Sequence, residues 1–252
     1  MKGDTIIQDL HSHTYYSFCG KDRPEEIVEA AIDGGVELFG ISDHSYGIGQ
    51  SKFNVFMSKD DDLFADYERT LIRYFDHINL IKEKYKDKIK VLCGIEVGTD
   101  LGIGRVPLPD TVDISFLDYC LVEGLSLLEK SSINGDIFSF AKRAGCVTGI
   151  AHTDMFTFIK KIGADPLDYF KKLAEYNIFW EMNVSYDSIH NYHEHQYVKE
   201  FFNNPEQQEI IRKSGIKLSV GFDGHRVEDY LADRVKDACD KLKTLGIPLV
   251  FD

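Results

Sequence analysis

The sequence lacks several features that would indicate other classes of protein. It has five cysteines, an odd number at irregular spacing, which excludes a regular disulfide framework. It has no apolar run long enough to span a membrane and no N-terminal signal-peptide pattern, so we expect no membrane association and a reducing cytoplasm as its compartment. No Ser/Gly-rich linker, repeat or composition break divides the chain. We therefore expect one domain over residues 1–252.

Positive charge is also scarce. The chain has 29 Lys and Arg against 42 Asp and Glu, a net charge of −13. Such a surface repels phosphate backbones, so nucleic acid is disfavoured as a partner. A small molecule is the expected partner instead.

What is present is a repeated alternation of short apolar runs with longer amphipathic segments. Strand followed by helix, about seven times over, predicts a parallel α/β fold, either closed into a barrel or left as an open doubly wound sheet. The runs predicted as strands are 5–10, 37–42, 89–97, 117–124, 146–151, 178–184 and 216–222, with a last short run, PLVF, at the end of the chain.

Two connections are longer than is usual in such folds, residues 45–61 and 185–205. Long connections after strands often serve as functional lids. The second contains His190, His193 and His195. These three residues are either an additional ligand or substrate cluster or part of a polar surface loop, and we favour the surface loop.

Six of the seven predicted strands carry ionisable residues at the same end. In a parallel barrel these ends meet at one mouth, where active sites lie. The residues are His11 and His13, then Asp43 and His44, Glu96, His152 and Asp154, Glu181 with Asn183, and finally Asp223 and His225.

Imidazole and carboxylate groups are ligands for divalent metals such as Zn, Mn and Fe. In an extended segment, His11 and His13 place both rings on one face, so both can reach the same ion. The convergence of further ligand types at the other strand ends predicts a metal centre at the barrel mouth.

The motifs DLHSHT, ISDH, GIEV, IAHTD and VGFDGH, in this order, resemble those of the PHP (polymerase and histidinol phosphatase) family over essentially the whole chain. The resemblance implies an α/β fold, a distorted (β/α)7 TIM-like barrel, with two or three divalent metals (Zn, Mn or Fe) at its mouth. It also implies hydrolysis of phosphate esters, the best-known small-molecule case being histidinol phosphate.

The resemblance also implies a ligand set. His11, His13, Glu96 and Asp223 match the ligands of a first metal. Glu96 would bridge to a second metal, which also takes His152. His44 and His225 match ligands of a third metal.

Two positions depart from the family pattern. Cys19 stands where a third-metal histidine is common, and it is either a thiolate ligand or an unliganded thiol. Leu125 aligns with a second-metal histidine and cannot ligate. Glu123, two residues earlier in the strand, is the candidate replacement.

We expect a metal-dependent phosphoesterase that hydrolyses a small phosphomonoester, similar to histidinol phosphate, through a metal-activated bridging water. Its catalytic candidates are Asp223, His225, His152 and Glu96. Asp154 is a candidate to orient His152 or to shuttle a proton. Glu181 is either a pocket residue or a structural carboxylate. The candidate substrate-binding residues are Arg226, Arg105 and Asn183, with Lys21, Arg23 and Lys52 as further cations for the phosphate.

Two alternatives stay open at this point. One is a nuclease or other hydrolase of the same fold that acts on short nucleotides. The other is a non-catalytic metal-binding barrel, which the departures at Cys19 and Leu125 favour.

Overall fold

The computed structural model describes residues 6–49, 67–99, 108–129 and 131–252. Its strands are β1 (Gln8–Asp9), β2 (Leu38–Ile41), β3 (Lys90–Cys93), β4 (Glu96–Gly98), β5 (Tyr119–Glu123), β6 (Val147–Ile150), β7 (Ile178–Asn183) and β8 (Leu218–Gly221). Its helices are α1 (Pro24–Asp33), α2 (Ser45–Gly49), α4 (Tyr67–Tyr85), α5 (Ile137–Ala144), α6 (Met155–Lys161), α7 (Pro166–Glu175), α8 (Gln196–Asn203), α9 (Pro205–Ser214), the 3-10 turn η2 (Val227–Asp229) and α10 (Ala232–Thr244).

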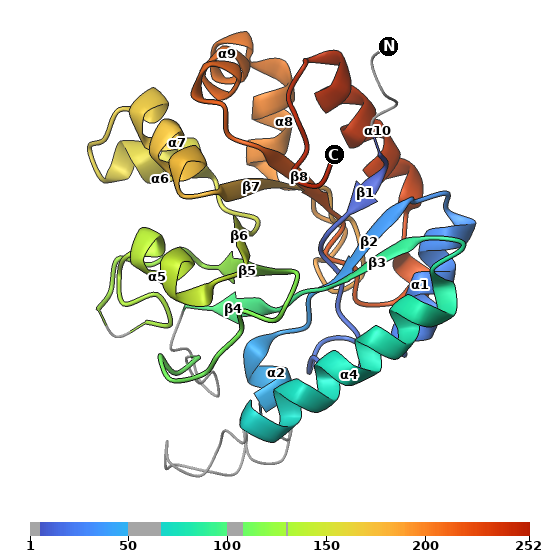
Figure 1. The fold of residues 1–252 in the computed structure, drawn as a ribbon. Coiled ribbons are helices and arrows are strands. Elements are labelled where there is room, and N and C mark those ends of the chain that lie inside the picture. The colour runs from blue at the N-terminus through green and yellow to red at the C-terminus, as the bar shows by residue number, and fades with distance from the viewer. Residues whose placement is uncertain (1–5, 50–66, 100–107, 130) are drawn as a thin grey trace.

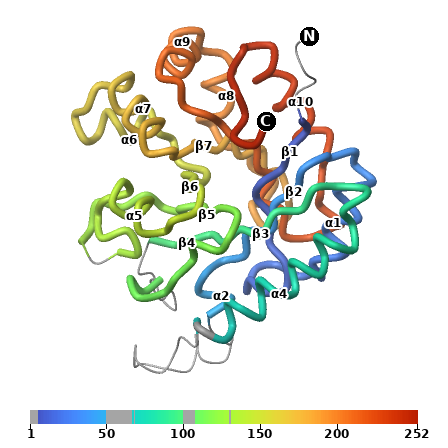
Figure 2. Tube along the Cα trace, viewed as in Figure 1, coloured from blue at the N-terminus to red at the C-terminus, as the bar shows by residue number. Residues whose placement is uncertain are grey.

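The strands form two parallel sheets, in the orders β1-β2-β3 and β4-β5-β6-β7-β8. Backbone hydrogen bonds join the edges of the sheets. Leu10 N donates to Val220 O at 2.9 Å between β1 and β8, and Glu96 N, at the start of β4, donates to Asp43 O, just beyond β2, at 3.0 Å. Strands from opposite ends of the chain therefore lie side by side (Figure 2). The helices cover the outside of the strands, as expected for a TIM-like barrel (Figure 1).

One predicted strand, 89–97, is divided into β3 and β4 at Gly94. The Asp118 carboxylate accepts a hydrogen bond from Cys93 N at 2.7 Å, at the end of β3. The Tyr119 ring packs so closely that a Cβ on Gly94 would lie 2.3 Å from it. Counting β3 and β4 as one interrupted strand gives seven strand positions.

Two other segments differ from the prediction. The last run, PLVF, is not a strand but makes a single parallel bridge between Leu249 and Leu218. The connection 185–205 is not all loop, because α8 begins at Gln196. The apolar face of α8 buries Tyr197, Val198 and Phe201, a spacing that places them on one side of a helix.

Short polar residues begin several of the helices that follow the strands. Asp136, Asp154 and Asp165 each accept a hydrogen bond from a backbone N–H in the first turn of α5, α6 and α7. Such caps satisfy donors that the helix leaves free. They fix where each helix starts and so the length of the loops at the barrel mouth.

Apolar side chains fill both the layer between strands and helices and the barrel interior. The interior cluster includes Leu10, Leu38, Tyr119, Leu121 and Phe179. The Tyr119 hydroxyl donates to Leu10 O at 2.6 Å, so its polar atom is satisfied inside the barrel. Among the helices that the structure describes, none has the length and apolar composition of a membrane span.

Candidate metal centre

The predicted ligands gather at the carboxyl ends of the strands. His11 and His13 follow β1, His44 follows β2, and Glu96 begins β4. His152 follows β6, while Asp223 and His225 follow β8. Most of these side chains are buried, and that of His152 is 21% exposed. His152 and Asp223 also have positive φ angles of 22° and 58°. Strained backbone of this kind is typical of functional sites.

The four residues that match a first metal converge closely. His13 Nε2 lies 3.0 Å from Asp223 Oδ1, and His11 Nε2 lies 3.4 Å from the same oxygen. The two Nε2 atoms are 3.1 Å apart. A tetrahedron with metal–ligand bonds of 2.0–2.1 Å has edges of about 3.3 Å.

Glu96 completes this first set. Its two oxygens lie 3.3 Å from His11 Nε2 and 3.4 Å from His13 Nε2. These distances also match the edges of a tetrahedral zinc site, so the four residues fit a divalent ion without large movement.

The charges of the cluster also fit a bound cation. In the described part of the chain, Glu96 and Asp223 form their ion pairs with histidines. Glu96 Oε2 and His44 Nδ1 are buried and form an ion pair at 2.7 Å without the geometry of a hydrogen bond. A bound metal ion would satisfy such buried ligand atoms.

Without a metal, the imidazoles and carboxylates shift one another's pKa. Burial opposes a charge on His11, but Asp223, Glu181 and Glu96 outweigh it and raise the pKa of His11 well above its usual value. Burial, together with the nearby His44 and His225, lowers the pKa of His13 to about 3. His13 is therefore neutral near pH 7, the form that ligates metal.

Glu181, in β7, contacts the first set of predicted metal ligands. Its Oε1 lies 2.8 Å from His11 Nδ1, on the ring edge opposite Nε2, and its Oε2 accepts from His152 N at 2.7 Å. Carboxylates that hold the far nitrogen of a histidine commonly orient metal ligands. Glu181 is thus a buried carboxylate behind the metal ligands, one of its two predicted alternatives.

The second metal set is centred on Glu96. His152 Nε2 lies 3.2 Å from Glu96 Oε1, and Glu123 Oε2 lies 3.7 Å from His44 Nδ1. Ligand atoms of His44, Glu96 and Glu123 lie within 4.8 Å of one another. Leu125 packs against the hydrophobic core. The strand therefore turns Glu123 toward the site.

Cys19 lies with three histidines. One ligand atom each of His13, Cys19, His44 and His225 falls within a span of 4.8 Å. Although burial opposes ionisation, hydrogen bonds with His225 and His44 lower the pKa of the Cys19 thiol to about 7. The structure thus places Cys19 beside His44 and His225, the two histidines predicted for a third metal, in a setting that favours a thiolate.

The interpretation of 185–205 as a polar surface loop is wrong for His190. Its Nε2 lies 3.1 Å from Asp223 Oδ2, and its Nδ1 lies 2.7 Å from Asp187 Oδ1. His195 stacks on His152 with 5.9 Å between ring centroids, whereas His193 is exposed. Asp187 is not among the residues predicted from the sequence. Its only signal was the Asp-x-x-His spacing, which is common by chance.

The predicted substrate-binding residues lie in different settings. Arg226 is next to His225, is about one-third exposed, and donates from Nη1 to Ser188 Oγ at 3.0 Å. The Asn183 amide donates to Glu181 Oε2 at 3.3 Å, and its Oδ1 accepts from Ser185 N at 3.0 Å. Asn183 therefore supports the Glu181 carboxylate.

The other predicted positions divide between surface and undescribed segments. Lys21 and Arg23 are mostly exposed and pair with Glu228 and Glu26. The Asp154 carboxylate caps α6 by accepting from Thr157 N at 3.0 Å. Arg105 and Lys52 lie outside the described residues.

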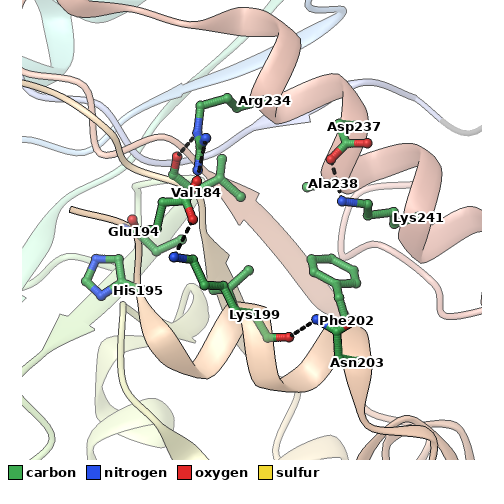
Figure 3. A pocket seen from close by; sticks show the side chains of 12 residues that line it. Val184, Glu194, His195, Lys199, Phe202, Asn203, Arg234, Asp237, Ala238 and Lys241 are labelled. Carbon is green, nitrogen blue, oxygen red and sulfur yellow. Dashed lines mark hydrogen bonds and ion pairs between the residues drawn. The ribbon is translucent and has the colours of Figure 1, made fainter. Parts of the chain in front are cut away.

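A cavity of about 210 Å³ lies between α8 and α10, next to the site (Figure 3). Asn183 and His195 are part of its lining. Its cations are paired: Lys199 and Arg234 with Glu194, and Lys241 with Asp237. This cavity presents no unpaired cation among these side chains for a phosphate group.

A parallel α/β barrel with a histidine and carboxylate cluster at the carboxyl ends of its strands defines a metal-binding barrel protein. The PHP domain model matches residues 9–247, and the chain belongs to the PHP domain family.

The chain also matches a Lactococcus lactis histidinol phosphatase, once by sequence and once by structure. It is 30% identical over 95 residues to a histidinol-phosphatase of subsp. lactis (strain IL1403), a match that spans 37% of this chain and only 30% of that relative. The crystal structure of a histidinol phosphate phosphatase of the same strain, complexed with zinc, L-histidinol and phosphate, has a TM-score of 0.56 at 18% identity, over 96% of this chain and 95% of that chain. The structural likeness shows a shared fold.

Proposed function

We propose that this protein is a metal-dependent phosphoesterase that hydrolyses a small phosphomonoester similar to histidinol phosphate, as a single domain over residues 1–252. The observation that carries the proposal is the spacing of His11, His13, Glu96 and Asp223, which matches the edges of a tetrahedral metal site. Membership of the PHP domain family and the names of the two relatives support the substrate class.

We assign the ligands by their contacts. His11, His13, Glu96 and Asp223 would hold a first ion. Glu96 and His152 would hold a second, with Glu123, which groups with Glu96 and His44, as its further ligand. Cys19, His44 and His225 would hold a third. Bound divalent metals would neutralise the phosphate oxygens and lower the pKa of a water between them.

The residues around the ligands fix this arrangement and admit the substrate. Glu181 holds His11 with its Nε2 toward the ion, and Asn183 supports Glu181. Arg226 lies beside His225, so its guanidinium is our candidate for binding a phosphate oxygen. Because the candidate ligands are buried and Arg226 is partly exposed, we expect the ester to bind from the side of Arg226.

A non-catalytic metal-binding barrel is the second candidate, and Leu125 is the observation that favours it. This side chain packs with the core, at a position where the family pattern has a histidine for the second ion. If Glu123 does not bind there, the second ion would be held by only two protein residues.

The test joins metal analysis to turnover. Purified protein is assayed for bound metal and for hydrolysis of histidinol phosphate, p-nitrophenyl phosphate and a dinucleotide, with Zn, Mn or Fe added back. Two or three ions per chain and release of phosphate from histidinol phosphate would support the proposal. Bound metal without turnover of any ester would favour the non-catalytic barrel, and activity only on the dinucleotide would contradict the substrate class.

Matched variants make the assay specific. Asp223→Asn removes a charge from the first metal set and should lower kcat/KM by about 100-fold or more, because metals contribute several kcal/mol to the transition state. Asp240→Asn makes the same change on the exposed face of α10 and should leave activity unchanged. Equal activity of both variants would contradict our ligand assignment.

A further inference from the structure

The segment between β7 and α8 sends two side chains into the metal centre that the ligand assignment does not use. Asp187 is fully buried, and His190 has 25% of its side chain exposed. The hydroxyl of Ser188, between them in sequence, bonds to Asp229 and accepts from Arg226. The segment is therefore fastened to the residues that follow β8.

His190 contacts the half of Asp223 that faces away from the first metal set. Asp223 Oδ1 lies 3.0 Å from His13 Nε2, whereas Oδ2 lies 3.1 Å from His190 Nε2. A carboxylate held at one oxygen presents the other in a fixed direction. His190 therefore contacts the far oxygen of Asp223, just as Glu181 contacts the far nitrogen of His11.

Asp187 lies between two histidines. Its Oδ1 is 2.7 Å from His190 Nδ1 and also accepts from His190 N at 2.9 Å. Its Oδ2 is 3.6 Å from His225 Nδ1, and both of these buried atoms make no hydrogen bond. A small movement of either side chain would join them.

The backbone of the same turn is strained. Asn191 and Tyr192 have φ angles of 54° and 56°, in the left-handed region. Tyr192 N donates to Asp187 O at 2.7 Å, which closes the turn. Tyrosine rarely adopts this conformation, and its cost must be offset by contacts of the folded segment. The contacts that Asp187 and His190 make can offset this cost.

We propose that Asp187 and His190 are positioning residues for the metal ligands: His190 orients Asp223 for the first ion, and Asp187 orients both His190 and His225, which serves the third ion. The inference rests on the proposed metal centre and adds to it a link between two of its ions. Partners of this kind commonly change metal affinity by about 10–100-fold.

The link predicts a pattern that distinguishes the two residues. His190→Ala should weaken one ion by about 10–100-fold. Asp187→Ala should weaken two, because it releases His225 as well as His190. His190→Gln keeps an N–H donor near Asp223 and should recover part of the lost affinity. His193→Asn, in the same segment but exposed, is the matched control and should bind as the wild type does.

The measurement is a titration of metal-free protein with Co²⁺ and with Zn²⁺ in competition with a chromophoric chelator, without substrate. Near-ultraviolet circular dichroism of each metal-free variant checks that it is folded, and Asp187→Ala serves if His190→Ala is not. Wild-type affinity for every ion in a folded His190→Ala, or in Asp187→Ala where that variant replaces it, would overturn the proposal. Loss of a single ion in Asp187→Ala would overturn the link to His225. If the wild type binds metal in this pattern but hydrolyses no ester, the proposed function fails and the positioning role stands.

Discussion

The role of Cys19 depends on whether its thiol is ionised. It lies in one cluster with His44 and His225, and contacts with both lower its pKa to about 7 despite its burial. Thiolates bind zinc and cobalt strongly, whereas hard ions such as Mg prefer oxygen. A thiolate at this position would therefore favour zinc-like ions at the third subsite.

We predict that the Co²⁺-loaded protein shows a thiolate-to-cobalt charge-transfer band in the near ultraviolet and that Cys19→Ser removes it. Absorption spectra of the two proteins at equal cobalt loading are the measurement. Cys146→Ser, at a half-buried thiol at the start of β6, is the control and should keep the band. A band that persists in Cys19→Ser would mean that Cys19 is an unliganded thiol.

Individual residues differ in how well the sequence predicted them. His11, His13, Glu96 and Asp223 could be predicted because each follows or begins a strand whose end must lie at the mouth. His190 and Asp187 could not, because a long connection has no periodicity that fixes where its side chains point. In the folded segment Tyr192 N bonds to Asp187 O, and His190 lies 3.1 Å from Asp223.

At the scale of elements, β8 shows how a strand makes room for the site. Gly221 ends this strand, and a Cβ placed there would lie 2.0 Å from Glu181 Oε1 and 2.6 Å from His11 Cβ. The absence of a side chain lets β7 and the residue after β1 approach closely. The hydrogen bond between Glu181 and His11 depends on this space.

We predict that Gly221→Ala displaces Glu181 and His11, costs about 1–3 kcal/mol of stability as overpacking does, and weakens the first ion. Gly98→Ala is the matched strand control, because its nearest neighbour would be Glu123 Oε2 at an ordinary 3.5 Å. Thermal unfolding and zinc titration of both variants are the measurements. Tight zinc binding by a stable Gly221→Ala protein would show that the site does not need this close approach.

At the scale of the whole molecule, the site is a cluster of buried ionisable side chains whose charges a bound metal would balance. In the metal-free protein, Glu96 outweighs the effect of burial and raises the pKa of His152 to about 9, from an ordinary 6.5. For His225, contacts with Asp187 and Cys19 likewise outweigh burial and raise the pKa to about 10. A raised pKa in the folded state means that protonation stabilises the fold.

We predict that metal-free protein loses stability as the pH rises. The contribution of His152 is fully present below pH 6.5 and lost as the pH passes about 9, a change of about 3 kcal/mol. With zinc present the trend should reverse, because protons no longer compete for the ligands. Thermal unfolding at pH 6.5 and 9.5, with chelator and with zinc, measures both trends.

His152→Gln is the control for groups that titrate elsewhere, and its metal-free form should show a shallower decline. Metal-free wild type that is more stable at pH 9.5 than at pH 6.5 would contradict the prediction. Removal of zinc by chelator should in any case lower the unfolding temperature, since an ion at 100 times its Kd adds about 2.7 kcal/mol.

The sequence by itself determined the order of strands and helices and the place of most ligands, because hydrophobic periodicity and strand-end position are local properties. It also identifies Cys19 and Leu125 as the positions that depart from the family pattern. The tertiary structure alone decided the rest. It divided 89–97 at Gly94, turned Glu123 rather than Leu125 toward the site, and brought Asp187 and His190 to Asp223. Each of these depends on contacts between segments far apart in the chain, which no local pattern encodes.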